Sequence, residues 1–221
     1  MLFTHYLISF SLAIILYFIF LKNKNVDILY KALFLLIGLN LFSFNTYLIL
    51  TEKFNPTIHL PLHLCYLTQI GVFISMIFNN KSFYTWLLLN SFGGGLTGFL
   101  NSNLTSEAML IEHCYLHLSH FNLLFFVLIL YKKKYIITKV EFIKSIVFNA
   151  LVFVSIIYYN LFFESNYWFT EERPSGINLT GILPPWPYYL IVLILIGIGS
   201  YYLTYKIFSK KINNSKTLSE L

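Results

Sequence analysis

The chain has 221 residues, of which 57 % are hydrophobic and 11 % are charged, and its mean hydropathy is +0.70. Because soluble domains carry about 25 % charged residues, this composition excludes a soluble fold. The formal net charge of +6 would suit nucleic-acid binding only if the basic residues formed one surface, and they are instead spaced between long apolar stretches.

Seven stretches of 19 or more residues contain no Lys, Arg, Asp or Glu. Crossing a bilayer core about 30 Å thick takes roughly 20 apolar helical residues. The sequence therefore predicts an all-α, polytopic transmembrane bundle of seven helices, with residues 1–208 as a single domain and residues 209–221 as a short basic cytoplasmic tail. The predicted spans are 2–21, 32–51, 54–80, 82–106, 113–131, 145–163 and 174–205.

The basic residues are distributed unevenly between the loops. All Lys and Arg residues except Lys53 and Arg173 follow an odd-numbered span, and short cytoplasmic loops carry an excess of Lys and Arg. This asymmetry predicts an N-terminus outside, a C-terminus inside and a multi-pass protein of the cell membrane. The basic excess then faces anionic lipid headgroups, so membrane lipids are the expected partners and nucleic acid is not.

The polar residues of the spans gather toward the predicted extracytoplasmic end. Span 54–80 opens with two prolines and two histidines, and the span that contains Gly94 and Gly98 follows it. This glycine pair has the small-xxx-small spacing that lets helix backbones approach closely in lipid. The longest loop, 164–183, carries acids, aromatic residues and Arg173.

The histidines have the most informative geometry. At about 100° per residue, His113, His117 and His120 fall within about 60° of one another and form one stripe. His59 and His63 also share a face. Ionisable groups inside spans usually face the bundle interior or a watery cavity. These histidines are therefore candidates for a general base or for transition-metal ligands, and the alternative is interfacial histidines hydrogen-bonded to the backbone.

Cys65 is a candidate nucleophile if a histidine lies close by. Its distance of two residues from His63 predicts side chains on nearly opposite sides of a helix, so the histidine would have to come from span 113–131. The alternative is a small buried apolar residue. A metal-dependent hydrolase would need a carboxylate here, but the only aspartate, Asp27, lies on the cytoplasmic side. No metal and no other cofactor is predicted.

Five short phrases form an ordered set between about residues 56 and 192. They are Leu60-Pro61-Leu62-His63-Leu64-Cys65, the glycine patch of span 82–106, Leu118-Ser119-His120, Asn166-Tyr167 with Pro174, and Trp186-Pro187-Tyr188-Tyr189. In this order they resemble the YwaF family of bacterial integral membrane proteins, which is distantly similar to an animal multispan acyltransferase that remodels ether phospholipids through a cysteine nucleophile. The resemblance implies a bundle of six or seven helices and lipid acyl-transfer chemistry.

The resemblance carries over to individual residues. The histidines of the bacterial pattern correspond to His63 and His120. Its later phrases correspond to Asn166, Tyr167, Trp186 and Pro187. The animal pattern places its cysteine before the histidine, where this chain has Leu62, so Cys65 departs from that pattern.

Together these features predict a polar pocket at the extracytoplasmic end that receives a lipid headgroup or ester. The predicted catalytic residues are His63, His120 and Cys65. The predicted substrate-binding residues are His117, Asn166, Tyr167, Arg173, Trp186 and Tyr189, with Arg173 holding phosphate. The favoured function is a phospholipid-modifying acyltransferase or hydrolase. The alternatives are a small-molecule or ion transporter, a ceramidase-like metal-dependent hydrolase and a non-catalytic membrane scaffold.

Overall fold

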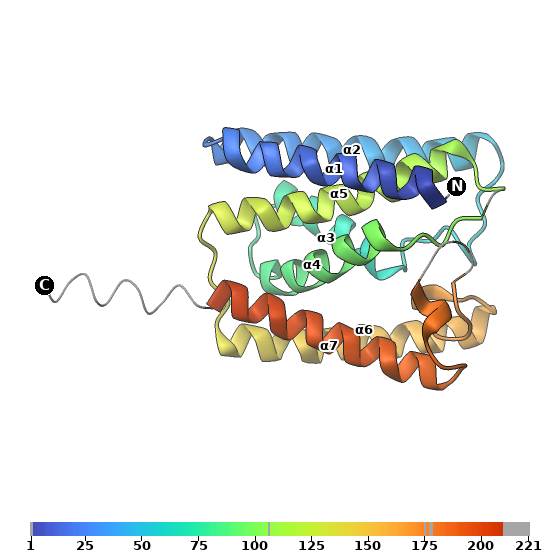
Figure 1. Cartoon of the computed structure of the whole chain (residues 1–221). Helices are drawn as coiled ribbons and strands as arrows, with labels where there is room; N and C mark the ends of the chain where they lie inside the picture. Colours follow the sequence, from blue (N-terminus) through green and yellow to red (C-terminus); the bar gives the residue numbers. More distant parts are fainter. Residues whose placement is uncertain (1, 106, 175, 177–178, 210–221) are drawn as a thin grey trace, which may run out of the picture.

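Helices form all the regular secondary structure in the residues that the computed structural model describes, which are 2–105, 107–174, 176 and 179–209 (Figure 1). The α-helices are Leu2–Lys22 (α1), Val26–Leu50 (α2), Leu64–Ile77 (α3), Tyr84–Leu100 (α4), Leu110–Lys132 (α5), Lys139–Phe163 (α6) and Tyr188–Ser209 (α7). Two short 3-10 helices, Tyr167–Phe169 and Leu179–Ile182, lie between α6 and α7. Of the predicted tail, residues 210–221 lie outside the described residues.

Within the described residues, α1, α2, α5, α6 and α7 are long and apolar enough to cross a membrane. Helix α3 has only 14 residues and is therefore about 21 Å long, less than the ~30 Å of a bilayer core. The predicted helical span 54–80 is wrong for residues 54–63, which form turns. Pro56 and Pro61 explain this difference, because proline removes a backbone donor and disfavours helical conformation in the residue before it.

Prolines also set the start of the last helix. The predicted span 174–205 begins well before α7, which starts at Tyr188 directly after Pro184, Pro185 and Pro187. In contrast, α2 and α6 begin among charged residues, earlier than predicted. The Asn25 side chain caps α2, and Thr138 forms a capping box at α6, so polar caps extend these helices beyond their charge-free stretches.

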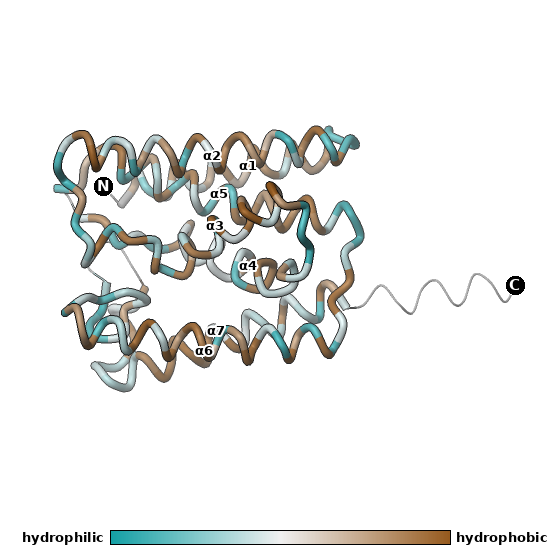
Figure 2. The backbone as a smooth tube through the Cα atoms, turned by 180° about the vertical axis from the view of Figure 1, so that it is seen from behind, coloured by the Kyte–Doolittle hydropathy of each residue, from teal (hydrophilic) through white to brown (hydrophobic). Residues whose placement is uncertain are grey.

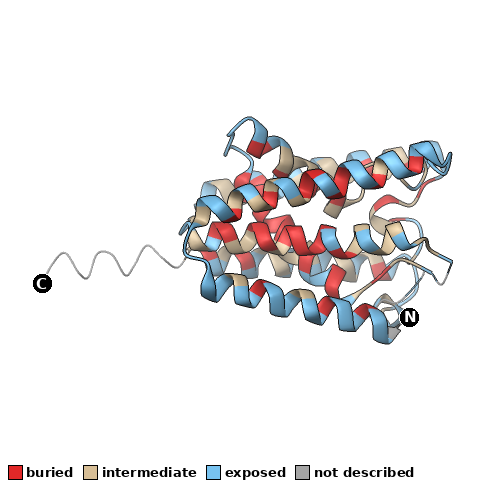
Figure 3. Cartoon of the chain, turned by 90° about the horizontal axis from the view of Figure 1, so that it is seen from above, coloured by how far each residue is buried: buried red, intermediate tan, exposed pale blue. Residues whose placement is uncertain are grey.

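Helices α4 and α5 form the centre of the bundle. Helices α1 and α2 cover one side and α6 and α7 the other (Figure 1). In the most apolar window of α5, 56 % of the residues are buried, against 11 % in α6 and in α7. The buried positions accordingly follow the inner helices (Figure 3). Helices α1, α6 and α7 are largely hydrophobic along their length (Figure 2), and many of their large apolar side chains are exposed. Exposed apolar helix faces are what a membrane-embedded bundle presents to lipid.

The N-terminus and the end of α7 lie at opposite ends of the bundle (Figure 1). We call the end at which α1 begins the N-terminal end. The described parts of the connections α2–α3, α4–α5 and α6–α7 all lie there, namely residues 51–63, 101–105, 107–109, 164–174, 176 and 179–187. The bundle therefore places its longest irregular backbone at one end, next to the first turn of α3.

The glycines of α4 let side chains of neighbouring helices contact its backbone. A Cβ atom added to Gly94 would lie 3.0 Å from the sulfur of Cys65 on α3. A Cβ atom added to Gly98 would overlap the imidazole ring of His120 on α5. The other two close contacts are those of Gly95 with Leu124 of α5 and Gly93 with Ser200 of α7. Three helices thus pack against the glycine face of α4, the close approach that small-xxx-small spacing predicts.

We predict that Gly98→Ala destabilises the protein by about 1–3 kcal/mol, the usual cost of inserting atoms into a filled interior. The added methyl group displaces the His120 ring. Thermal unfolding in detergent measures the effect as a lower Tm. Gly199→Ala is the matched control, because nothing lies within 4 Å of a Cβ at that position. An equal Tm for the two variants would show that the glycine face tolerates a side chain.

Candidate functional site

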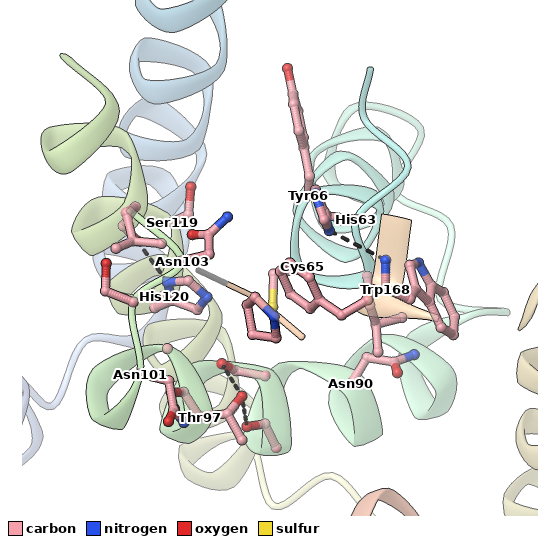
Figure 4. Close-up of a pocket in the computed structure, with 18 of the residues that line it drawn as sticks. His63, Cys65, Tyr66, Asn90, Thr97, Asn101, Asn103, Ser119, His120 and Trp168 are labelled. Atoms are coloured by element: carbon pink, nitrogen blue, oxygen red, sulfur yellow. Dashed lines mark hydrogen bonds between the residues drawn. The ribbon is translucent and has the colours of Figure 1, made fainter. Parts of the chain in front are cut away.

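A cavity of about 470 Å³ lies among α3, α4, α5, α7 and the loops of the N-terminal end (Figure 4). Its lining includes all three predicted catalytic residues, His63, Cys65 and His120. Other polar residues of the lining include Asn90, Thr97, Asn101, Asn103, Glu112, Ser119, Ser200 and Tyr201. The fold therefore brings together three chemically capable side chains from two different helices.

Cys65 and His120 lie over successive turns of the same face of α4. Their contact positions, Gly94 and Gly98, are four residues apart, and positions with this spacing are about 5–6 Å apart on a helix surface. The sulfur of Cys65 is a free thiol. In Figure 4, Cys65 lies between His120 and His63. Cys65 of α3 and His120 of α5 therefore lie near each other, at neighbouring positions along α4.

One hydrogen bond determines the tautomer of His120. Its Nδ1 lies 2.7 Å from the carbonyl oxygen of Leu116. Because a carbonyl oxygen only accepts, Nδ1 carries the hydrogen, and Nε2 of the neutral ring holds the free lone pair. His120 is 7 % exposed and held in place by Gly98. It is therefore a buried imidazole of the cavity lining that carries its lone pair on Nε2.

His63 has the opposite arrangement. The backbone N–H of Trp168 donates to Nδ1 of His63 over a long 3.5 Å, so Nδ1 accepts and Nε2 carries the hydrogen. The ring packs edge-on against Tyr167, at 5.0 Å between centroids, and beside Phe169 at 5.2 Å. His63 thus offers a donor where His120 offers an acceptor.

The spacing of His63 and Cys65 predicts side chains on nearly opposite sides of a helix. This prediction is wrong, because both side chains line the same cavity. The reason is local backbone geometry. His63 is the N-cap of α3, with φ −60° and ψ 138°, so the helical rotation of 100° per residue does not apply across it. The cap geometry keeps both side chains on the cavity side.

The first turn of α3 adds hydrogen-bond donors beside Cys65. The N–H groups at the start of an α-helix have no acceptor within the helix, and the His63 side chain makes no cap bond to them. Cys65 is the second residue of this helix, where the helix dipole favours negative charge. The sulfur and any oxyanion formed next to it therefore lie at an end of a helix that stabilises anions.

A second, more polar hollow of about 450 Å³ adjoins the cavity. Its lining includes Glu164, Asn166, Glu172 and Arg173. Five residues line both hollows: Ile58, His63, Asn103, Phe169 and Pro174. His63 therefore lies at the junction between a largely apolar cavity and a charged one.

The loop after α6 is organised by Asn160, which is 1 % exposed. Its amide donates to the carbonyl oxygen of Tyr167 and to the hydroxyl of Thr170, both at 2.8 Å. Its carbonyl oxygen accepts from the backbone of Tyr167 at 3.0 Å and from Ser165 at 2.9 Å. All hydrogen-bonding groups of this amide are satisfied, so it fixes the conformation of the loop. Asn160 is not among the residues that the sequence predicts for the site, although an amide in an apolar span is an available signal.

Two aromatic residues of this loop hold the segment that precedes α3. The hydroxyl of Tyr167 donates to the carbonyl oxygen of Pro56 at 2.7 Å and accepts from the N–H of Leu60 at 3.0 Å. Burial raises the pKa of Tyr167 to about 12, which keeps the hydroxyl a donor. The indole of Trp168 donates to the carbonyl oxygen of Leu62 at 2.6 Å. The loop thereby fixes the backbone that positions His63.

The remaining predicted binding residues join the loop to α7. Arg173 donates through one nitrogen to the carbonyl oxygens of Leu183 and Pro184, and its guanidinium lies 5.7 Å from the ring centre of Tyr189. The indole of Trp186 donates to the backbone of the loop at 3.0 Å. Of the six predicted substrate-binding residues, Asn166 and Arg173 line the polar hollow, and the other four line neither hollow.

The predicted histidine stripe divides between two neighbours. His120 faces Gly98 of α4, whereas His117 packs against His5 of α1 at 4.9 Å between ring centroids. Helix α5 lies between α1 and α4, so 60° on its surface is enough to direct two side chains to different helices. Within the described part of the chain, no group of three or more His, Cys, Asp or Glu residues is arranged to hold a metal ion.

The helices and the two hollows define a multi-pass integral membrane protein with a largely apolar cavity inside its helical bundle and a polar hollow beside it. The particular family follows from comparison with known families. The TMEM164 family model matches residues 1–205, so the chain belongs to the TMEM164 family. No curated protein and no solved structure matches the chain. The resemblance to the YwaF family stays a prediction.

We predict that Tyr167→Phe loosens the N-terminal end. The change keeps the ring and removes both hydrogen bonds of the hydroxyl, which leaves buried backbone groups unpaired at a cost of about 1–3 kcal/mol. We expect a lower Tm and faster proteolysis within 164–187. Tyr158→Phe is the control, because Tyr158 is 60 % exposed on α6. Indistinguishable proteolysis of the two variants would show that the Tyr167 hydroxyl does not hold the segment before α3.

Proposed function

We propose that the protein is a membrane-lipid acyltransferase in which Cys65 carries the acyl group between two lipids. The observation that supports this most strongly is the placement of Cys65 and His120 over successive turns of α4 in one cavity. A thiol beside a fixed imidazole acceptor is the arrangement of an activated cysteine nucleophile. The hydrogen bond from His120 to Leu116 leaves Nε2 free to take the proton.

The adjoining hollows match the shape of a phospholipid. The apolar cavity accommodates hydrocarbon, and the polar hollow accommodates a headgroup, with His63 at their junction. Arg173 supplies a positive charge for phosphate, and Glu164 and Glu172 supply negative charge for an amine. This distribution favours a zwitterionic phospholipid whose ester lies near the junction.

The first half of the proposed reaction uses His120, Cys65 and the backbone N–H groups at the start of α3. His120 Nε2 takes the proton of the Cys65 thiol, and the thiolate attacks the ester carbonyl of the donor lipid. The N–H groups of the first turn of α3 stabilise the oxyanion. Collapse of the tetrahedral intermediate breaks the ester C–O bond, and the leaving alkoxide takes the proton from His120, which leaves an acyl thioester on Cys65 and a lysolipid.

The second half of the reaction restores the thiol. His120 removes the proton of an acceptor lipid hydroxyl, which attacks the thioester, and the departing sulfur of Cys65 takes that proton back. Water in place of the acceptor gives hydrolysis. The largely apolar lining of the cavity favours a lipid acceptor over water. The Nε2–H of His63 is placed to donate to the phosphate or to the carbonyl oxygen at the junction.

We predict that Cys65→Ala and His120→Gln each lower acyl transfer by about 100-fold or more. The assay uses purified protein in phosphatidylcholine liposomes that contain a labelled lysophospholipid acceptor. Intact-protein mass spectrometry is expected to detect an acyl adduct on the wild type and none on Cys65→Ala. Cys114→Ala is the matched control, since Cys114 is an exposed free thiol. A wild type with neither transfer nor adduct, or an active Cys65→Ala variant, would refute the proposal.

We further propose that the N-terminal end of the bundle faces outward from the cell membrane. The loops rich in lysine lie at the other end, as the positive-inside rule requires. In a Cys114→Ala background, a membrane-impermeant maleimide added to intact cells is expected to label Glu171→Cys and to label Lys24→Cys only after lysis. Both positions are exposed. The reverse pattern would invert the orientation, and the background protein without an added cysteine measures reaction at Cys65.

A further inference from the structure

Helix α7 contacts α4 closely only along its second half. Ser200 lies against Gly93, Tyr201 donates a hydrogen bond to Asn90, and Thr204 is fully buried. One turn earlier the contact is lost. Gly197 lines the cavity, yet nothing lies within 4 Å of a Cβ added to it. The first half of α7 diverges from α4 (Figure 1), and the cavity extends into the space between them.

This α4–α7 part of the cavity has no charged residue among those described. Its lining consists of Leu89, Gly93, Leu193, Ile196 and Gly197, together with the hydroxyl residues Thr97 and Ser200 and the hydrogen-bonded pair Asn90 and Tyr201. Among the described residues that line the whole cavity, Glu112 is the only Asp, Glu, Lys or Arg, and it belongs to the first turn of α5 at the N-terminal end. A headgroup would leave its charges unpaired between α4 and α7, so this part suits hydrocarbon.

The same region is open to the membrane. Ile196 lines the cavity and is 50 % exposed, whereas Leu89 on the opposite wall is completely buried. A hydrocarbon chain can therefore enter sideways from the bilayer and reach a wall that bulk lipid does not contact. The cavity volume of about 470 Å³ lies within the range of about 300–1,000 Å³ that ligand pockets span.

We propose that the space between α4 and α7 binds the acyl chain of one membrane lipid, and that Gly197 determines how long a chain fits. The proposal rests on the proposed acyl transfer only for the direction of the chain, whose carbonyl end then faces Cys65. Glycine at position 197 leaves open the volume that any larger side chain would fill. Chain length is thus selected by a residue that contacts neither the thiol nor the headgroup hollow.

The test measures chain binding without catalysis, in the Cys65→Ala background. The probes are lysophosphatidylcholines with a photoreactive diazirine at the end of a long or a medium acyl chain, in phosphatidylcholine liposomes. Peptide mass spectrometry after irradiation locates the adducts. We expect the long-chain probe to label Leu89, which bulk lipid does not reach, and Gly197→Phe to reduce this labelling at least about fivefold while the medium-chain probe still labels the cavity.

Gly199→Phe is the matched control. Gly199 also has nothing within 4 Å of an added Cβ, but it does not line the cavity. The long-chain probe is therefore expected to label Leu89 equally in the Gly199→Phe variant and in the Cys65→Ala background protein. Labelling confined to the exposed outer faces, or equal labelling of Gly197→Phe and Gly199→Phe, would overturn the proposal. Labelling of Leu89 in a protein that shows no acyl transfer would sustain chain binding while the proposed enzymatic function fails.

Discussion

The close approach of three helices to the backbone of α4 is the constraint on which the site depends. Association between helices in lipid gains little from hydrophobic burial, so it relies on van der Waals contact and on small residues that permit it. At Gly94 and Gly98 this contact also places the residues of the proposed site, because the side chains that fill the space beside these glycines are Cys65 and His120. One surface of one helix thereby determines both how α3 and α5 pack and where the thiol and the imidazole lie.

The loop that follows α6 meets a second requirement of a membrane protein. Non-helical backbone near the hydrocarbon must find internal hydrogen-bond partners, and segment 51–63 is such a backbone. Tyr167 and Trp168 supply part of these partners, and Asn160 keeps the loop in the conformation that does so. The hydrogen bonds that satisfy the loop are thus also the ones that orient His63.

The sequence predicts the architecture well, because long charge-free stretches and glycine spacing are local properties. It predicts helix ends less well, since Pro61 and Pro187 delay the starts of α3 and α7 inside apolar stretches, where no charged residue marks the boundary. The site combines residues from distant parts of the chain, so its membership could be predicted but its geometry could not. The angle between His117 and His120 is a local quantity, whereas their separation onto His5 and Gly98 depends on how α5 lies between its neighbours.

The tautomers of the two cavity histidines show why both backbone and packing are needed for chemistry. His120 lies inside a helix and donates to the carbonyl four residues earlier, which only a helical backbone can present. His63 lies just before a helix and accepts from a distant loop, which only the folded N-terminal end can present. Identical side chains therefore offer opposite hydrogen-bonding groups to one cavity. The backbone position of each histidine, and not the chemistry of its side chain, decides which ring accepts a proton and which ring donates one.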